Sequence, residues 1–417
     1  MRIIICELKK IWTPKILGII TLICALFYIT SMHHQLQWYQ RGTWADTVDF
    51  AHHLTENYGA ILLQEDFEDF LNYRDVIVQE LDLFIASNQF FSTIGIYNFN
   101  DYENFRTQMG EIYFYHTEEQ RQLWIGVALE WGYLIRTEIG GETVDIAPEN
   151  EIPISYARMI QFGNIVGIYH TNIILEDEWP TWIYLFMELA PLSERESQRL
   201  IEIRDSGELL NIMTQSTMRT TWEYGRSVAT LIILVTLVLV SPLIVKDRTT
   251  KVNWLQYSSK QGRSVLKKQL IAIIISAVII TTIIISVFAG IFSTLETWAF
   301  WNNGINSFMS VPFHWLSITY GQYVLLIVAV IYLLSVGTAV FAFVLSRYSQ
   351  NMVRLMFKII PLFVATQMLS SLVLTSFLAI FEGGNVIQQT VSLLSAFVVA
   401  LAVAAFIVRN EKRVEIV

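Results

Sequence analysis

Six apolar stretches run through this 417-residue chain, and each is long enough to cross a membrane as a helix. The hydrocarbon core of a bilayer is about 30 Å thick, so a spanning helix needs about 20 mainly apolar residues. A helix also bonds its own backbone polar groups, which lipid cannot do. The stretches are 16–32, 226–245, 269–292, 323–345, 359–381 and 386–408. The sequence therefore predicts an all-α polytopic membrane protein with six transmembrane helices in a one-plus-five layout.

The charges divide the chain into an acidic part and a basic part. Residues 33–225 hold 31 acidic residues, 10 arginines and no lysine, while the rest holds 18 basic and 6 acidic residues. Segments beside membrane helices are rich in Lys and Arg on the cytoplasmic side and poor in them after translocation. We therefore expect 33–225 to be one extracytoplasmic domain. Its acidity would repel nucleic acid, and the basic remainder suits a bilayer with anionic lipids.

The same rule predicts the side of each remaining segment. Residues 246–268 carry seven Lys or Arg against one Asp, so this loop should be cytoplasmic, as should the N-terminal segment 1–15 and the tail 409–417. Residues 293–322 carry no Lys or Arg and should lie outside. Spans three to six occupy 269–408. The prediction is a multi-pass protein of the cell membrane with both termini in the cytoplasm, whose first span is an uncleaved anchor.

The large segment between spans one and two reads as mostly helical. Residues 64–86 and 118–136 place apolar side chains at helical spacing. Ser193 followed by Glu196 has the capping-box pattern, and its helix could run to Arg226 and continue into span two. Residues 139–151, with two glycines and a proline, predict a turn-rich break.

No motif for catalysis, a metal or a cofactor occurs in the sequence. It lacks the phosphate-binding loop G-x-x-x-x-G-K-[ST] and the zinc motif H-E-x-x-H, and its two cysteines form no metal pair. The adjacent pairs His33–His34 and His52–His53 would point in different directions on a helix, so we expect no metal site there. The chain is therefore expected not to be an enzyme by itself and to bind no cofactor.

The loop between spans two and three carries an aromatic patch among cations. Trp254, Leu255 and Tyr257 form the patch, and Lys260 and Arg263 follow it. Two interpretations remain open at this point. The loop could be an amphipathic helix that lies on the lipid surface, or a helix that docks in a groove on a cytoplasmic partner.

The topology and two short stretches resemble the permease subunits of type-2 ABC exporters, most closely those of Gram-positive bacteria. The stretches are Leu-Gln-Tyr-Ser-Ser-Lys-Gln-Gly-Arg at 255–263 and Phe-Trp-Asn-Asn-Gly-Ile-Asn-Ser at 300–307. One departure is that the helix ahead of span one is only Arg2 to Lys15 and is interrupted by Pro14. In that family the first stretch is a coupling helix seated on a separate ATPase subunit, and that subunit binds the ATP.

The resemblance implies an export function that the chain shares with partner subunits. The partners would be an ABC ATPase, a second permease copy or a paralogue, and the substrate a peptide, a lantibiotic-like molecule or a lipid. The implied coupling interface comprises Asp247, Trp254, Leu255, Tyr257, Lys260 and Arg263. The alternative is a non-transporting membrane scaffold or phage-receptor-like protein, which can have the same one-plus-five layout.

Overall fold

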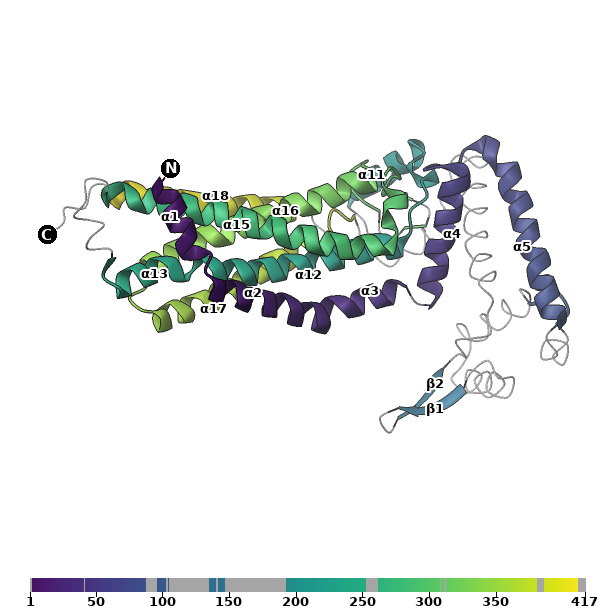
Figure 1. Ribbon diagram of the computed structural model, residues 1–417. Helices are drawn as coiled ribbons and strands as arrows, with labels where there is room; N and C mark the ends of the chain where they lie inside the picture. The colour runs from purple at the N-terminus through teal and green to yellow at the C-terminus, as the bar shows by residue number, and fades with distance from the viewer. Residues whose placement is uncertain are drawn as a thin grey trace. The chain divides into compact units, whose positions relative to one another are not determined.

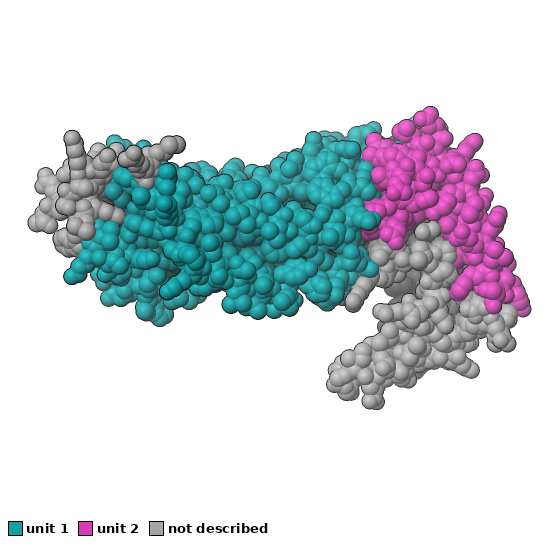
Figure 2. All heavy atoms as spheres, in the orientation of Figure 1, with its two compact units in different colours: residues 1–41, 192–417 teal, residues 42–191 magenta. Residues whose placement is uncertain are grey.

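The computed structural model describes most of the chain outside the long segment between spans one and two. The described residues are 2–40, 42–87, 96–102, 104, 135–139, 142–146, 193–252, 262–307, 309–310, 313–380 and 386–411. They fall into two compact units, coloured separately in Figure 2. Unit 1 comprises Met1–Arg41 and Leu192–Val417, and unit 2 comprises Gly42–Pro191. The residues on either side of unit 2 in the sequence thus belong to the unit that holds the apolar helices.

Unit 1 is a bundle of long helices (Figure 1). Among its described residues, six helical segments are long and apolar enough to cross a membrane, at 14–39, 215–249, 265–295, 320–347, 352–374 and 387–410. This confirms the prediction of six spans. The helices are α1 (Arg2–Ile11), α2 (Pro14–Phe27), α3 (His33–Tyr39), α11 (Glu194–Asp205), α12 (Gln215–Val240), α13 (Pro242–Thr249), α15 (Gly262–Phe292), α16 (Tyr320–Arg347), α17 (Met352–Leu374) and α18 (Val386–Glu411).

Helix α12 lies at the centre of the bundle. In the most apolar 18 residues of the span that contains α12, 78% of the residues are buried. The corresponding share in the first span is 11%. Hydroxyl groups join it to its neighbours, because the Thr236 hydroxyl lies 3.2 Å from the Ser335 hydroxyl of α16, and Tyr224 donates its hydroxyl to the carbonyl of Phe288 of α15 at 2.9 Å. Such hydrogen bonds hold helices together where lipid offers no polar partner.

The outer surface of the bundle is strongly apolar. On α17, Phe357 and Met368 expose 74% and 69% of their surfaces, and similar side chains line α18. A soluble monomer rarely exposes contiguous apolar surface of this kind. Together with the length of the helices, this makes the chain a multi-pass membrane protein whose apolar surface meets a lipid bilayer.

Helix α17 corrects the boundaries of the fifth predicted span. The helix begins at Met352, where the Asn351 side chain accepts the Arg354 N–H, and ends at Leu374 instead of Phe381. Arg354 and Lys358 in its first turns lower the local mean hydropathy, so the start predicted at residue 359 lies after the observed start. Pro361 therefore lies inside the helix and not in its first turn, where its missing N–H would have cost nothing.

The connection into α12 is also interrupted. Ser193 and Glu196 form both bonds of a capping box, as predicted, and begin α11. The prediction of one helix through to Arg226 is wrong, because α11 ends at Asp205 and Gly207 adopts a left-handed conformation with φ +74°. A short 3₁₀ turn (Glu208–Leu210) follows, and Thr214 caps a new helix, α12.

The described residues of unit 2 include helices α4 and α5, a short helical stretch at 99–102 and one hairpin. Helix α4 covers Gly42–Tyr58, and α5 covers Phe67–Ser87 after a 3₁₀ turn at Gln64–Asp66, so the helix predicted over 64–86 is confirmed. Strands β1 (Ile135–Ile139) and β2 (Glu142–Ile146) pair antiparallel around the two glycines. The helix predicted over 118–136 lies outside the described residues except for its last two positions, which are in β1.

Candidate functional site

Helix α13 leads from the second span into the predicted cytoplasmic loop, and it carries Asp247. The Asp247 side chain is buried, and both of its carboxylate oxygens accept hydrogen bonds from Lys10 Nζ, at 3.1 and 3.0 Å. Lys10 lies on α1, 237 positions away in the sequence. The root of the loop is therefore bonded to the N-terminal helix.

Four side chains from three helices form this contact, and we call them the Lys10 cluster: Glu7, Lys10, Asp247 and Gln269. Lys10 Nζ also donates to Glu7 Oε1 at 2.9 Å. From α15, Gln269 Nε2 donates to Asp247 Oδ2 at 2.9 Å and to Glu7 Oε2 at 3.3 Å. Both carboxylates are almost fully buried, so their charges are stabilised by these donors instead of water.

The cluster also changes the titration of its lysine. Burial by itself lowers the pKa of Lys10, but the hydrogen bonds and charges of Glu7 and Asp247 outweigh it, and the net pKa is raised. A raised lysine pKa stabilises the fold at every pH below the ordinary value of 10.5, and this is lost as pH rises through the folded pKa. The Lys10 side chain therefore stays an ammonium ion under physiological conditions.

The next residue bonds α13 to a fourth helix. Arg248 donates through its guanidinium to the backbone carbonyls of Arg347, at 2.8 Å, and Ser349, at 2.7 Å. These carbonyls lie at the C-terminal end of α16, where the helix dipole and unbonded carbonyls favour a cation. Asp247 and Arg248 together hold the root of the loop to α1, α15 and α16.

Helix α1 packs on the bundle despite its short length. Ile11 is buried, and Trp12 Nε1 donates to Ser276 Oγ of α15 at 3.1 Å. Figure 1 shows α1 crossing the bundle at the end where α13 lies. The interruption at Pro14 separates α1 from α2, because Pro14 is the first residue of α2 and Thr13 is extended.

The other predicted interface residues are only partly placed. Trp254, Leu255, Tyr257 and Lys260 lie outside the described residues, and Arg263 is in the first turn of α15. The sequence reasoning missed the partners of Asp247. The signals available were the i,i+3 spacing of Glu7 and Lys10 and a single amide, Gln269, at the edge of an apolar stretch.

At the opposite end of the bundle, the run 300–307 closes on the segment that precedes α12. Asn303 Nδ2 donates to the carbonyl of Ile212 at 2.6 Å, and the Ser307 hydroxyl donates to the carbonyl of Asn211. The N–H of Gly304 donates to Asn211 Oδ1 at 3.0 Å. A Cβ at Gly304 would lie 2.6 Å from that amide group, so only glycine permits the approach. The run has a structural role that accounts for Asn303, Gly304 and Ser307.

His314 is a buried histidine at this same end. The backbone N–H of His314 donates to Asn306 Oδ1 at 2.7 Å. The imidazole ring packs edge-on against the ring of Tyr323, with the centroids 5.7 Å apart. Ring atom Nδ1 has no hydrogen-bond partner within the described part of the chain. Burial lowers the pKa of His314 to about 3, so the ring is neutral at physiological pH.

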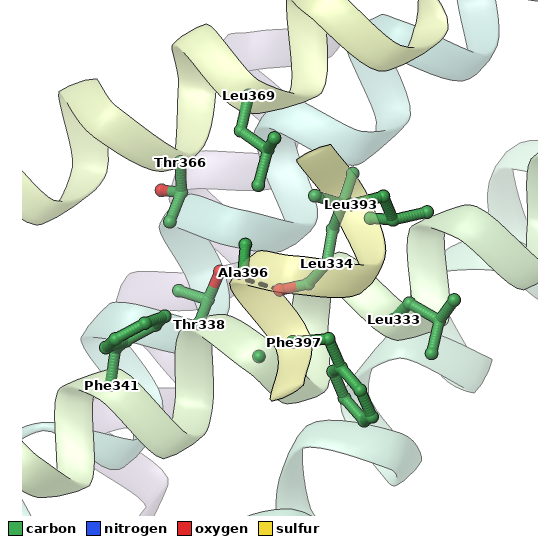
Figure 3. Close-up of a pocket in the computed structure, with 10 residues that line it drawn as sticks. Leu333, Leu334, Thr338, Phe341, Thr366, Leu369, Leu393, Ala396 and Phe397 are labelled. Carbon is green, nitrogen blue, oxygen red and sulfur yellow. Dashed lines mark hydrogen bonds between the residues drawn. The ribbon is translucent and has the colours of Figure 1, made fainter. Parts of the chain in front are cut away.

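The bundle also contains apolar pockets. Figure 3 shows one between α16, α17 and α18. Its empty volume, including the part open to the surroundings, is about 280 Å³. The hydroxyl of Thr338 beside it donates to the carbonyl of Leu334 at 2.7 Å and is already satisfied. No ionisable side chain lines this pocket, which therefore offers no proton or ion relay. Among the described residues, no group of three or more His, Cys, Asp or Glu could hold a metal ion.

Comparison with known proteins does not assign a family. No family model, curated protein or solved structure matches the chain. Helix length, apolar composition and exposed apolar surface identify it as a multi-pass membrane protein with six candidate spans.

Proposed function

We propose that this chain is the transmembrane permease subunit of an ATP-driven exporter whose ATP is hydrolysed by a separate subunit. The substrate would be a peptide, a lantibiotic-like molecule or a lipid. The observation that carries the proposal is the bonding of Asp247 and Arg248 to three helices at the root of the 246–268 loop.

A loop that receives force from a partner must not yield at its root. Here α13 enters the loop with Asp247 held by α1 and α15, and with Arg248 held by the end of α16. On the far side of the loop, α15 begins at Gly262 and carries Gln269 back into the same cluster. A push on the loop would then move several spans together. A loop that only rested on lipid would need no such attachment.

The orientation in the proposal follows the charge pattern. The α13 end, with its lysines and arginines, would face the cytoplasm and an ATPase, while unit 2 would lie outside. The aromatic residues Trp254 and Tyr257 would be the anchors buried against the ATPase, since aromatic side chains dominate such interfaces. Lys260 and Arg263 would lie at the rim, where an exposed cation contributes little.

The test is purification of the tagged full-length chain from its native membrane, with the attached proteins identified by mass spectrometry. We expect a stoichiometric subunit with an ATP-binding phosphate loop. Trp254→Ala and Tyr257→Ala should each weaken its association about fivefold or more, since truncated anchors cost about 1–4 kcal/mol. Trp38→Ala is the matched control, because that tryptophan is exposed on α3.

Each alternative predicts a different result. A membrane scaffold or phage-receptor-like protein would bring down no ATPase with the wild-type chain. A loop that lies on lipid would keep any ATPase attached in both aromatic variants. Either outcome would contradict the coupling role.

A further inference from the structure

A second apolar pocket, which we call the slot, lies between α12, α15 and α16. Its walls are residues 221–228 of α12, 285–292 of α15 and 324–331 of α16. It is open on one side, and its empty volume, including the open part, is about 480 Å³. At 1.5 Å per residue, the slot runs for roughly 10 Å along the helices.

Hydrogen bonds between helices close the slot at both ends. At the deep end, Thr281 and Thr282 of α15 bond to Ser335 and Tyr332 of α16, at 2.7 and 2.8 Å. At the end nearer residues 293–319, the Thr221 hydroxyl lies 2.8 Å from the hydroxyl of Tyr320. Helices α15 and α16 are thus hydrogen-bonded to each other beyond the deep end of the slot, and the slot lies between them.

The interior of the slot is almost entirely hydrocarbon. Its polar groups are satisfied, because Tyr224 donates its hydroxyl to the carbonyl of Phe288 at 2.9 Å and Thr221 donates to the carbonyl of Thr217. The floor is close-packed at Gly225, where an added Cβ would lie 2.8 Å from Ile327 Cγ2. Water would find no partner in such a space.

The position of the opening identifies what can enter. The walls belong to spans two, three and four, so the slot lies at the depth of the bilayer's hydrocarbon. Ala289, which lines the slot, is small and exposed. The medium that meets this opening is the acyl region of one leaflet, which the charge pattern predicts to be the outer leaflet.

We propose that the slot binds one acyl chain of a bilayer phospholipid. The chain fills the space that α15 and α16 leave, and contacts Ile285 of α15 and Val328 of α16, which line the slot and are half-buried. Packing drives this binding, since an acyl chain leaves an equally apolar medium to enter the slot. The site does not depend on the protein being an exporter.

The test uses the full-length protein reconstituted with phosphatidylglycerol that carries a photoreactive diazirine in its acyl chain. After irradiation, we expect adducts on Ile285 and Val328 in the wild type. Ala289→Trp should fill the slot and lose these adducts. Val287→Trp is the matched control, because Val287 is 55% exposed on the same helix and does not line the slot, so its adducts should remain.

Native mass spectrometry in mild detergent supplies an independent measurement. The wild type and Val287→Trp should each retain one more phospholipid per protomer than Ala289→Trp. Ala289→Leu, a smaller filling, serves if the tryptophan variant melts at a lower temperature than its control. Equal phospholipid retention in the filled and control variants, adducts confined to exposed residues, or a retained molecule other than a phospholipid would each overturn the assignment.

Discussion

Lys10→Met removes the ammonium group that two buried carboxylates share, while it keeps most of the aliphatic side chain. Glu7 and Asp247 are only 3% and 6% exposed, and both still bond to the amide of Gln269 after the change. Two like charges then lie close together with less compensation. We expect the variant to be less stable at pH 7 and to recover at lower pH.

The magnitude follows from two bounds. Removing one partner of a buried ion pair costs about 3–5 kcal/mol, and the 33% exposure of the Lys10 side chain lowers this through solvent screening. A carboxyl group can also take up a proton, which from an ordinary pKa of about 4 costs about 4 kcal/mol at pH 7 and about 1.4 kcal/mol at pH 5. We therefore expect a loss of about 2–4 kcal/mol at pH 7 that falls below about 1.5 kcal/mol at pH 5.

Thermal melting of the purified full-length protein, followed at both pH values, measures this loss. The control is Lys9→Met, because Lys9 is the exposed neighbour on the same helix. Lys10→Met/Asp247→Asn should be less destabilised than the sum of its single changes, because it removes the unpaired charge as well. A melting temperature of Lys10→Met equal to that of the Lys9→Met control at pH 7, or a defect that does not shrink at pH 5, would refute the electrostatic account.

Three further predictions concern topology, pH and packing. In a cysteine-free background, Thr294→Cys should react with an impermeant thiol reagent on intact cells, and Thr250→Cys only after permeabilisation; the reverse pattern would invert the topology. As pH falls below the ordinary histidine pKa of about 6.5, protonation of unfolded His314 should lower stability by up to about 1.4 kcal/mol per unit, and His314→Gln should reduce that slope in melting experiments. Gly304→Ala should cost about 1–3 kcal/mol by melting, whereas Gly290→Ala, with nothing within 4 Å of its added Cβ, should cost nothing.

The sequence predicted the number and approximate positions of the spans because length and apolarity alone decide whether a helix can cross a bilayer. Boundaries were less accurate where other forces act. Arg354 and Lys358 hid the first turns of α17, since a hydropathy reading excludes cations that a helix at the interface can carry on long side chains. Gly207 ended the helix that the capping box begins, and only its left-handed backbone revealed this.

The candidate site was harder to predict because its partners are far apart in sequence. Asp247 was identified from its place in the loop, but the loop pattern contains no sign that Lys10 would reach it. The run 300–307 was identified only by its resemblance to a family. The structure explains its residues by the hydrogen bonds that the side-chain amides of Asn303 and Asn211 form. Neither contact follows from local periodicity, since each depends on how distant helices pack.

Helix α12 joins the two bonded ends of the bundle into one element. With α13 it forms a 35-residue apolar span, about 52 Å long at 1.5 Å per residue. It begins directly after the Asn211–Met213 segment that holds the 300–307 run, and it ends at Asp247 and Arg248. Its central position means that it cannot shift without moving α15 and α16, to which the hydroxyl groups of Tyr224 and Thr236 tie it. In the proposed exporter, force applied at the loop would therefore reach the opposite end of the bundle through a single buried helix.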